Sequence, residues 1–570
     1  MKKELTIKIA GEAGQGMQTI GFALCKMFKN LGLDIFANQD YMSRIRGGNN
    51  FFQVRVSNEP LYALRRDSDI VVALDKQSVS IHGKNISSRG LLILDRNKFN
   101  ITEEGKKFLD APMYELAIKT GGSELFVNSV ALGIIAGLCK IEFSAVEKIL
   151  KDIFSDKSQE IIGRNLEAAK AGYDFSRDKF REGFFVLKQK AAKEGLLLNG
   201  NESLALGAVR AGCKFYSGYP MTPSTGIMDN MAHFSRDFDI VVEQAEDEIA
   251  AINMVIGASF TGSRAMTATS GGGFCLMVEG LSLAGMTETP VVMVDAQRPA
   301  PATGFPTRTE QADLGFLIHA GHGEFARVVL APGTIEEAFY LTVKAFNLAE
   351  KYQIPVLILT DQHLADSYRN IKMFDLKRAQ VKRYIISKEE SAQISGYRRY
   401  AFTASGISPR AVPSWINDVI YVDSDEHNEE GHITEDALTR NKMVEKRFHK
   451  KMQGLTKEII KPAAYNIERA DIILVGFGST FGVMKEACDS LKKPKTGFLH
   501  LPWVWPFPHK EVTGLLRKGK KIITVENNAA GQLARLIRQE TGIKADKSIL
   551  KFDGRPFDLD YLIERLKKEK

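Results

Sequence analysis

The stretch Phe215-Tyr-Ser-Gly-Tyr-Pro-Met-Thr-Pro-Ser-Thr225 opens the part of the chain that decides its fold, residues 212–313. Four loops in this part are rich in Gly, Pro, Thr, Ser or acidic residues, and helix-like segments lie between them. Each loop follows a short apolar run, at 214–216, 239–242, 264–268 and 290–295. Short apolar strands that alternate with helices indicate βαβ units and a parallel sheet buried on both faces. Ligands bind such sheets beyond the carboxyl ends of the strands, where we expect these loops to gather.

Three consecutive acids, Glu246-Asp247-Glu248, precede an apolar, alanine-rich segment that we expect to be a helix. Acids in a first helical turn are favoured by the helix dipole, so capping is one interpretation of the cluster. Because most faces of the helix are apolar, at least one acid is expected to enter a buried environment. Burial raises the pKa of a carboxyl group, which can then hold or donate a proton at neutral pH. The cluster is therefore a candidate for catalysis as well as for capping.

Two proline-rich segments carry hydroxyl and arginine side chains. In Tyr219–Thr225, two prolines restrain the backbone and three aliphatic hydroxyls can point at a ligand. The alternative is a turn in which Ser224 or Thr225 caps a helix. In Arg298–Thr307, three prolines stiffen the backbone around an arginine, which suits the binding of a carboxylate. An arginine at the end of a strand is also common without such a role.

The N-terminal region contains a glycine loop, Gly11-Glu-Ala-Gly14-Gln-Gly16, between the alternating strand 5–10 and a helix expected over 17–31. This order suits a phosphate at a helix N-terminus. The spacing differs from the dinucleotide fingerprint, so we favour contact with another phosphate or another subunit. Further on, Arg44 and Arg46 beside a Gly-Gly turn could bind an anion through their forked donors. Two surface arginines at a hairpin-like turn are an equal alternative.

The whole chain has 570 residues, too many for one core, and the alternation of strands and helices predicts an α/β protein of several domains. We expect three doubly wound domains with mostly parallel sheets, a linker helix and a less periodic insert. The domains are expected over 1–180, 196–370 and 461–570, the linker helix over 181–195 and the insert over 371–460.

Composition excludes several classes of function. No 18-residue apolar run and no secretory signal are apparent, which indicates a soluble protein without membrane partners. The net charge of +8 is small for this length, and the basic patches are interpreted as solvated faces, so no nucleic-acid partner is expected. The five cysteines are far apart and no Cys-x-x-Cys occurs. They predict reduced thiols in a cytoplasmic protein, with neither structural zinc nor an iron–sulfur cluster in this chain.

The insert contains an acidic loop, residues 423–432, with five carboxylates and two histidines. Such a group could ligate a divalent metal. We favour a solvated acidic loop, and we predict no metal site in this chain.

Taken in order, these segments resemble the 2-oxoacid:ferredoxin oxidoreductases, specifically an α subunit with the γ domain fused at its N-terminus. The resemblance covers essentially the whole length. Gly11–Gly21 with Ser43–Gly48 resembles the γ domain. Tyr219–Thr225, Glu248 and Arg298–Thr307 resemble the pyrimidine-binding domain of the α subunit. Asp471–Thr541 resembles its transketolase C-terminal-like domain.

The resemblance implies thiamine diphosphate as cofactor and oxidative decarboxylation of a 2-oxoacid. The products, formed with coenzyme A, would be an acyl-CoA, CO2 and reduced ferredoxin. Glu248 would hydrogen-bond the aminopyrimidine ring and promote loss of the thiazolium proton. The residues expected to hold the 2-oxoacid are Arg298, Thr222 and Thr307. The residues expected around the cofactor, or facing the coenzyme A phosphates, are Tyr219, Pro220, Gly14, Gly16, Arg44 and Arg46.

Two departures from the family pattern predict a partner. The chain has no Gly-Asp-Gly followed by Asn: Phe552-Asp-Gly-Arg555 lies in a tail without one, and Asn527-Asn528 has no preceding Gly-Asp-Gly. It also has no clustered cysteines. The diphosphate half of the site, Mg²⁺ and the 4Fe–4S cluster are therefore expected in a β subunit. An (αβ)2 assembly that reduces ferredoxin is the family expectation.

Several alternatives remain for the activity. 2-Oxoglutarate is favoured, because its second carboxylate needs another cation, and Arg44 and Arg46 could supply it. Pyruvate or a broad specificity is the first alternative. A non-redox thiamine-dependent transferase or decarboxylase subunit is the second, and a nicotinamide-dependent dehydrogenase based on Gly11–Gly16 is disfavoured by the spacing. A scaffold paralogue would have no need of Glu248, Arg298 and Thr307.

Overall fold

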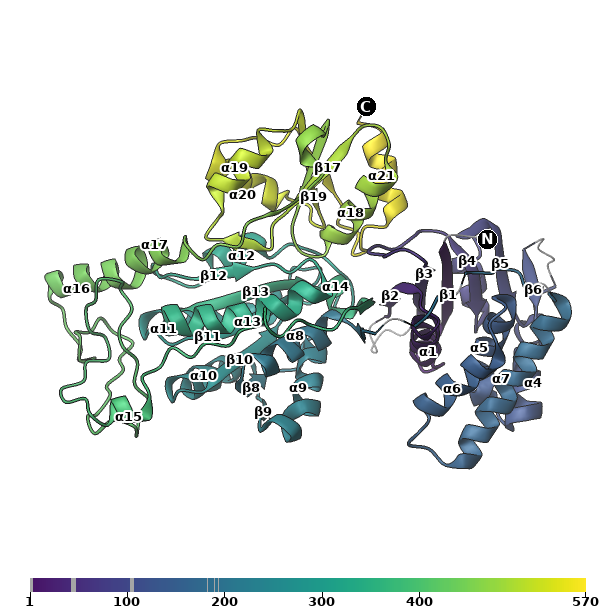
Figure 1. The fold of residues 1–570 in the computed structure, drawn as a ribbon, viewed down its shortest axis with the longest axis horizontal. Helices are drawn as coiled ribbons and strands as arrows, with labels where there is room; N and C mark the ends of the chain where they lie inside the picture. The colour runs from purple at the N-terminus through teal and green to yellow at the C-terminus, as the bar shows by residue number, and fades with distance from the viewer. Residues whose placement is uncertain are drawn as a thin grey trace. The chain divides into compact units, whose positions relative to one another are not determined.

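The computed structural model describes residues 4–42, 48–102, 107–181, 183–188, 190–192 and 194–569 (Figure 1). The chain forms two compact units. The first comprises Met1–Leu198, Ser367–Met373 and Asp558–Glu564, and the second comprises Asn199–Asp366, Phe374–Phe557 and Arg565–Lys570. Three sheets with helices around them confirm the α/β class with mostly parallel sheets.

The first unit is built on an eight-stranded sheet with the order β6-β5-β4-β1-β3-β2-β14-β7. Strands β6, β5, β4 and β1 are parallel, whereas β3, β2, β14 and β7 join by antiparallel pairing. The alternating sequence 51–56 falls in the antiparallel part, as such a pattern predicts. The strands are β1 (Glu4–Glu12), β2 (Asp34–Asp40), β3 (Asn49–Ser57), β4 (Ser68–Ala73), β5 (Ile86–Leu94), β6 (Phe108–Asp110), β7 (Leu196–Leu198) and β14 (Tyr368–Ile371).

Helices of the first unit pack against this sheet and against one another. Helices α5 and α7 approach closely because Gly133 and Gly172 face the other helix: a Cβ on Gly133 would collide with the Ala169 carbonyl. The helices are α1 (Met17–Asn30), α2 (Lys76–His82), α3 (Arg96–Phe99), α4 (Met113–Leu116), α5 (Val127–Leu138), α6 (Phe143–Ile153) and α7 (Gln159–Lys179), with a π-helix at Ala117–Gly121 and a 3-10 turn at Glu124–Phe126.

Within the described ranges, no single helix is long and apolar enough to cross a membrane. One pair of helical segments, Met113–Gly121 and Glu124–Leu138, meets the length and composition criterion together, with a bend of 114° between them. Helix α5, which forms most of the second segment, is almost wholly buried in the core of the first unit.

The helix predicted over 181–195 is wrong, because the described residues of that segment contain none. Helix α7 ends at Lys179, and Gly183 adopts a positive φ of 77°. The segment then donates backbone hydrogen bonds from Phe184 and Phe185 to the Leu138 carbonyl. Phe185 is buried in the core of the first unit, so tertiary packing of the aromatic side chains outweighs the local helical preference of the charged sequence.

The second unit contains a seven-stranded sheet with the order β18-β12-β13-β11-β10-β8-β9, parallel except for β18. Helices cover both faces, with α10, α11 and α12 on one side and α8, α9 and α13 on the other. The strands are β8 (Cys213–Gly218), β9 (Val241–Gln244), β10 (Arg264–Thr269), β11 (Val291–Gln297), β12 (Val328–Leu330), β13 (Pro355–Asp361) and β18 (Trp503–Trp505). The helices are α8 (Gly200–Arg210), α9 (Thr225–Phe238), α10 (Glu248–Phe260), α11 (Gly271–Met286), α12 (Leu314–His319), α13 (Ile335–Tyr352) and α14 (Gln362–Asp366).

The same unit contains a five-stranded sheet with the order β15-β17-β16-β19-β20, parallel except for β15. Its side chains share one apolar core with α10, α11 and α12, so the two sheets of the unit are packed together. The strands are β15 (Ala463–Tyr465), β16 (Ile472–Gly476), β17 (Thr496–His500), β19 (Lys521–Glu526) and β20 (Lys547–Leu550). The helices are α18 (Thr480–Ser490), α19 (His509–Leu516), α20 (Gln532–Thr541) and α21 (Leu559–Lys567).

Residues 374–455 contain little regular structure and are held by buried ion pairs. Glu288 accepts a hydrogen bond from Lys446 and forms an ion pair of 2.6 Å with Lys451, and these charges hold the pKa of Glu288 well below its usual range against the opposing effect of burial. The acidic loop 423–432 pairs with arginines, among them Arg447 with Glu426 at 2.7 Å. Across the described residues, no group of three or more His, Cys, Asp and Glu could hold a metal. The helices are α15 (Lys388–Ser391), α16 (Ala437–Val444) and α17 (Lys451–Leu455), with a π-helix at Glu445–Lys450.

Candidate active site

Loops that follow four neighbouring strands begin at the carboxyl edge of the seven-stranded sheet, whose strand order can be followed in Figure 1. Strands β9, β8, β10 and β11 are parallel neighbours, so their carboxyl ends lie at one edge, as the sequence predicts. The loops that begin there carry Tyr219–Thr225, Glu246–Glu248, Ser270–Gly273 and Arg298–Thr307.

The three acids after β9 have different positions. Glu246 is exposed, and Asp247 caps α10 by accepting a hydrogen bond of 2.8 Å from the Ala250 backbone N–H. Glu248 is only 3% exposed, and its Oε1 has no hydrogen-bond partner among the described residues. Capping is therefore performed by Asp247, which leaves the Glu248 carboxylate available for a ligand. A buried carboxylate oxygen without a partner is costly, and such an atom in a native fold requires an explanation.

Arg298 lies close enough to Glu248 for their charges to interact. Its Nη1 donates a hydrogen bond of 2.8 Å to the backbone carbonyl of Thr222. Burial lowers the pKa of Arg298 below its ordinary value, and the Glu248 carboxylate opposes that shift. The structure therefore brings together three of the residues that the sequence singles out, from the loops after β8, β9 and β11.

The remaining predicted residues of this unit lie nearer the surface. Tyr219 is 40% exposed, while Pro220 is partly exposed at the start of the same loop. Thr307, nine residues beyond Arg298, is also partly exposed. Ser224 precedes α9, but its hydroxyl donates to the Met221 carbonyl at 2.7 Å instead of capping the helix.

The sequence reasoning missed the role of Gly273 in the turn after β10. A Cβ on Gly273 would collide with Thr269 Oγ1 and Glu248 Oε1, so only glycine leaves room for the Glu248 carboxylate. It also missed Asp295 and Asp313, two buried acids beside this turn. The available signal for Asp295 was an acid inside the otherwise apolar strand Val291–Gln297.

The glycine loop of the first unit has the geometry that its glycines predict. Gly14 and Gly16 have positive φ angles of 92° and 71°, and Gly16 immediately precedes α1. The Gln15 side chain closes the loop by accepting from the Glu12 N–H at 2.8 Å. A Cβ on Gly16 would collide with the Asn128 side-chain amide. Arg44 and Arg46, predicted to bind an anion near this loop, lie outside the described residues.

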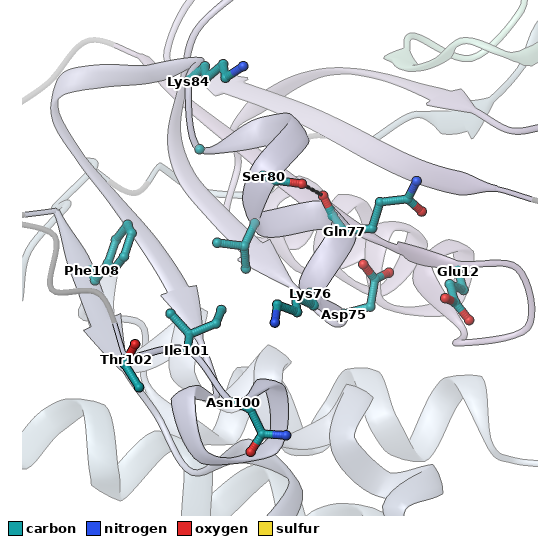
Figure 2. Close-up of a pocket in the computed structure, with 12 residues that line it drawn as sticks. Glu12, Asp75, Lys76, Gln77, Ser80, Lys84, Asn100, Ile101, Thr102 and Phe108 are labelled. Carbon is teal, nitrogen blue, oxygen red and sulfur yellow. Dashed lines mark hydrogen bonds between the residues drawn. The ribbon is translucent and has the colours of Figure 1, made fainter.

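A cavity of about 850 Å³ opens beside the glycine loop in the first unit (Figure 2). Glu12 and Asp75 line it from the ends of β1 and β4, and Lys76 and Lys84 line it from α2 and its end. Gly14 and Gly16 are not among the lining residues, so the cavity lies next to the glycine loop and not within it. Its mixed charges do not select one ligand.

Three family descriptions match consecutive parts of the chain. Residues 6–175 match pyruvate ferredoxin/flavodoxin oxidoreductase, and residues 206–446 match the thiamine-diphosphate-binding domain of pyruvate flavodoxin/ferredoxin oxidoreductase. Residues 470–560 match core domain II of pyruvate:ferredoxin oxidoreductase.

Relatives match the whole length. The chain is 35% identical to the 2-oxoacid:ferredoxin oxidoreductase subunit alpha of Sulfolobus sp, over 98% of this chain and 96% of that protein. It is 35% identical to the 2-oxoglutarate synthase subunit KorA of Methanocaldococcus jannaschii, over 58% of this chain and 88% of the relative. A solved 2-oxoglutarate:ferredoxin oxidoreductase from Magnetococcus marinus, with 2-oxoglutarate, coenzyme A and succinyl-CoA bound, has a TM-score of 0.92 and 32% identity over 100% of both chains.

A doubly wound sheet with a buried carboxylate and a buried arginine at its carboxyl edge is typical of α/β enzymes, whose ligands bind at that edge. The match over nearly the whole of the Sulfolobus protein makes the assignment more specific. The chain belongs to the 2-oxoacid:ferredoxin oxidoreductase family, among the α subunits, which confirms the resemblance found in the sequence.

Proposed function

We propose that this chain is the thiamine-diphosphate-binding α subunit of an enzyme that oxidatively decarboxylates a 2-oxoacid, with 2-oxoglutarate the favoured substrate. One observation supports the proposal most directly: the buried Glu248 Oε1, which no described residue hydrogen-bonds. The description of the family matched by residues 206–446 supports the cofactor. The names of the Methanocaldococcus and Magnetococcus relatives support 2-oxoglutarate, and the bound ligands of the latter support coenzyme A as co-substrate.

The residues around Glu248 fit a thiamine pyrimidine ring. The carboxylate is held at the start of α10, in a space that Gly273 keeps open. A ring nitrogen that donates or shares a proton would satisfy the unpartnered oxygen. When bound, thiamine diphosphate supplies an acidic carbon that can add to the 2-oxoacid carbonyl and accept electrons from the breaking bond. Glu248 would hold and move the proton of the pyrimidine, and Tyr219 and Pro220 would border the ring.

Arg298 would orient the carboxylate of the 2-oxoacid. The Thr222 carbonyl fixes one guanidinium nitrogen, and the other donors of the planar group remain for a forked contact. Thr222 and Thr307 would add hydroxyl contacts from the neighbouring loops. Gly14, Gly16, Arg44 and Arg46 would face coenzyme A phosphates or the active site in the assembled enzyme.

Substitution of Arg298 by lysine should raise KM for the 2-oxoacid more than it lowers kcat. Lysine keeps the charge but cannot make the forked contact of the guanidinium group. The loss of one hydrogen bond to a charged group costs about 1.5–3 kcal/mol, which corresponds to a rise in KM of about 10- to 100-fold. Steady-state kinetics with the purified complex measure both constants. Arg236→Lys on the exposed end of α9 is the control. An unchanged KM in Arg298→Lys would exclude a role in substrate binding.

A β subunit would cover the exposed side of α10 and α11. Both helices are apolar around most of their circumference, which is typical of buried helices, yet Ile249, Met254 and Leu276 are about half exposed. This strip begins at Ile249, the residue after Glu248. The partner would supply the diphosphate site, Mg²⁺ and the 4Fe–4S cluster, consistent with the α-subunit names of the relatives.

Leu276→Glu should weaken binding of the β subunit by about 30-fold or more, because a charge in the centre of an apolar interface costs about 2 kcal/mol or more. Co-purification and analytical ultracentrifugation of the two subunits measure the effect. Leu125→Glu, at a leucine that is 83% exposed in the first unit, is the matched control. Equal weakening by both substitutions would contradict this choice of interface.

The proposed function is tested with the chain co-purified anaerobically with its β subunit. Isothermal titration measures thiamine diphosphate binding, and reduction of a viologen dye is assayed with coenzyme A and, in turn, 2-oxoglutarate, pyruvate and a branched-chain 2-oxoacid. Dye reduction and succinyl-CoA formation with 2-oxoglutarate are the expected results. A complex that binds the cofactor but reduces no dye with any acid would favour the non-redox thiamine-dependent transferase instead.

A further inference from the structure

Two buried acids beside the candidate site have no role in the proposed function. Asp295 is 1% exposed, and neither of its carboxylate oxygens has a hydrogen-bond partner in the described part of the chain. Asp313 is 9% exposed, and its Oδ2 is equally unpartnered among those residues. Three unsatisfied carboxylate oxygens in one core would be strongly destabilising if both groups were ionised. Their arrangement therefore requires a proton or a ligand.

The fold places the two carboxyl groups on the same side of the sheet. Asp295 and Gln297 are two residues apart on β11, so their side chains point to the same face. The Gln297 Oε1 accepts a hydrogen bond of 2.9 Å from the Asp313 N–H, which places Asp313 over that face. Apolar neighbours surround the pair, including Met293 two residues earlier on β11 and Leu314 next to Asp313.

Asp313 also faces the first turn of α11. A Cβ on Gly271 would lie 2.5 Å from Asp313 Oδ2, so the carboxylate lies against the first residue of that helix. Helix α11 has no acid in its own first turn, and Ser270 makes no side-chain capping bond. The positive end of the helix dipole therefore favours a negative charge at Asp313. Two residues further along the same turn, Gly273 abuts Glu248.

A loop of the five-stranded sheet fixes the backbone around Asp313. Asn527 and Gln311 exchange two hydrogen bonds, of 2.7 Å and 3.1 Å. The Asn528 amide donates to the Gln311 carbonyl at 3.1 Å, and Gln532 binds Ala312 O at 2.5 Å and Gly315 N at 2.8 Å. This accounts for Asn527-Asn528, which stood in the sequence without an assigned role. Hydrogen bonds at Gln311 and Ala312 before Asp313, and at Gly315 after it, therefore hold its backbone in place.

We propose that Asp295 and Asp313 share one proton, and that the single remaining charge of this acid pair holds the first turn of α11 where Gly273 meets Glu248. Asp295 and Asp313 are then positioning residues for the pyrimidine contact, and this part of the proposal rests on the proposed function. Sharing a proton removes one buried charge and satisfies two of the three unpartnered oxygens by one hydrogen bond. The remaining negative charge is stabilised by the positive end of the α11 dipole.

Electrostatics support this assignment. Burial raises the pKa of Asp313 to about 6, and burial together with the Asp313 carboxylate raises the pKa of Asp295 well above its usual value. Burial, and then Asp313 and Asp295, also raise the pKa of Cys275 on α11. The other charged or titratable groups on the surrounding elements include Arg264 at the start of β10, Glu248 on α10, Glu279 on α11, Arg298 directly after β11, Glu310 before α12, His319 in α12 and Asp361 at the end of β13. No lysine or arginine contributes to the pKa shift of Asp295 or Asp313.

The pH dependence of stability has a definite sign. Both acids have a folded pKa above the ordinary value of 3.8, so their contribution to stability is complete below about pH 4. It is lost as the pH rises from about 4 through 6 and above, because first Asp313 and then Asp295 must ionise in the core. Asp295→Asn replaces one acid by a permanent hydrogen-bond donor and should remove the part of this loss that is due to Asp295.

The first test uses the full chain without cofactor or partner. The difference in Tm between Asp295→Asn and the wild type is measured at pH 5 and at pH 8, and it should increase in favour of the variant by about 2–4 °C. Asp237→Asn, at an exposed acid of α9, should show a difference that is independent of pH. A difference for Asp295→Asn that does not change with pH would overturn the shared proton. A Tm that rises with added Mg²⁺ and falls with EDTA would assign the oxygens to a cation instead.

The second test measures thiamine diphosphate affinity in the complex with the β subunit. Asp313→Asn removes the charge next to α11 and should raise the dissociation constant about 10-fold, whereas Asp295→Asn keeps that charge and should raise it much less. Equal effects of the two substitutions would contradict the positioning role. Should Asp313→Asn fail to fold, the pH dependence of Asp295→Asn decides the proposal. Because the first test needs no cofactor, it can succeed even if the proposed function is wrong.

Discussion

Glu248→Gln should lower kcat of the assembled enzyme by about 10²- to 10⁴-fold, the range for loss of a group that transfers a proton in the reaction. Glutamine has the size of glutamate but carries no charge and accepts no proton at its amide. The fold should be unaffected, because the wild-type carboxylate has an oxygen that no described residue satisfies. An amide in its place removes a buried charge, so Tm should stay the same or rise. Dye-reduction kinetics and thermal unfolding of the same preparation measure the two effects.

Glu246→Gln is the matched control for this prediction. Glu246 precedes Glu248 by two residues, is exposed and lies in the same acidic cluster. Its substitution changes the net charge equally and should leave kcat unchanged. Full activity of Glu248→Gln, or an equal loss in both variants, would remove the main support for a thiamine site in this sheet. Titration with thiamine diphosphate separates a loss of binding from a loss of chemistry.

Gly273→Ala should also inactivate the enzyme, by displacing the Glu248 carboxylate. The new Cβ would collide with Glu248 Oε1 and Thr269 Oγ1, so both side chains must move. Overpacking of this kind lowers the free energy of unfolding by about 1–3 kcal/mol, and a displacement of a catalytic group by about 1 Å can lower the rate about 10²-fold. Chemical denaturation and dye-reduction kinetics measure the two effects.

Gly514→Ala in helix α19 provides the comparison. No atom lies within 4 Å of a Cβ at Gly514, so alanine meets open space. The substitution should raise the free energy of unfolding by up to about 1 kcal/mol through helix propensity alone and leave kcat unchanged. If Gly273→Ala were as active as Gly514→Ala, the turn after β10 would not determine the position of Glu248.

The features predicted successfully from the sequence are those that depend on neighbouring residues. Apolar runs between glycine- and proline-rich loops are enough to predict the parallel strands β8, β10 and β11, and parallel strands bring their loops to one edge. The burial of one acid in Glu246–Glu248 follows from the apolar helix behind it. The same topology predicts that Arg298 and Thr222 lie close together, but it does not predict which of their atoms form the hydrogen bond.

The features that were missed depend on residues far apart in the chain. Asp295 and Asp313 belong to two segments that only the packing of α12 over β11 brings together. Gln311 meets Asn527 across 216 residues, and nothing near either residue indicates the other. The predicted helix over 181–195 failed for the same reason, since Phe185 belongs to a core made by earlier parts of the chain. Local patterns predict strands and helices, whereas the partners of individual side chains come from the tertiary fold.

The first unit is assembled from three separate stretches of the chain, and this has a consequence for biosynthesis. Strand β2 pairs with β14, and the Asn370 side chain bonds Ile35 N and Leu33 O, at 2.8 Å and 3.1 Å. A ribosome therefore finishes the first 198 residues long before it makes the strand that covers β2. Until then the growing polypeptide exposes an unpaired sheet edge, which invites pairing with other nascent chains. If residues 1–198 were expressed alone, the edge of β2 would stay unpaired, and we expect that fragment to aggregate.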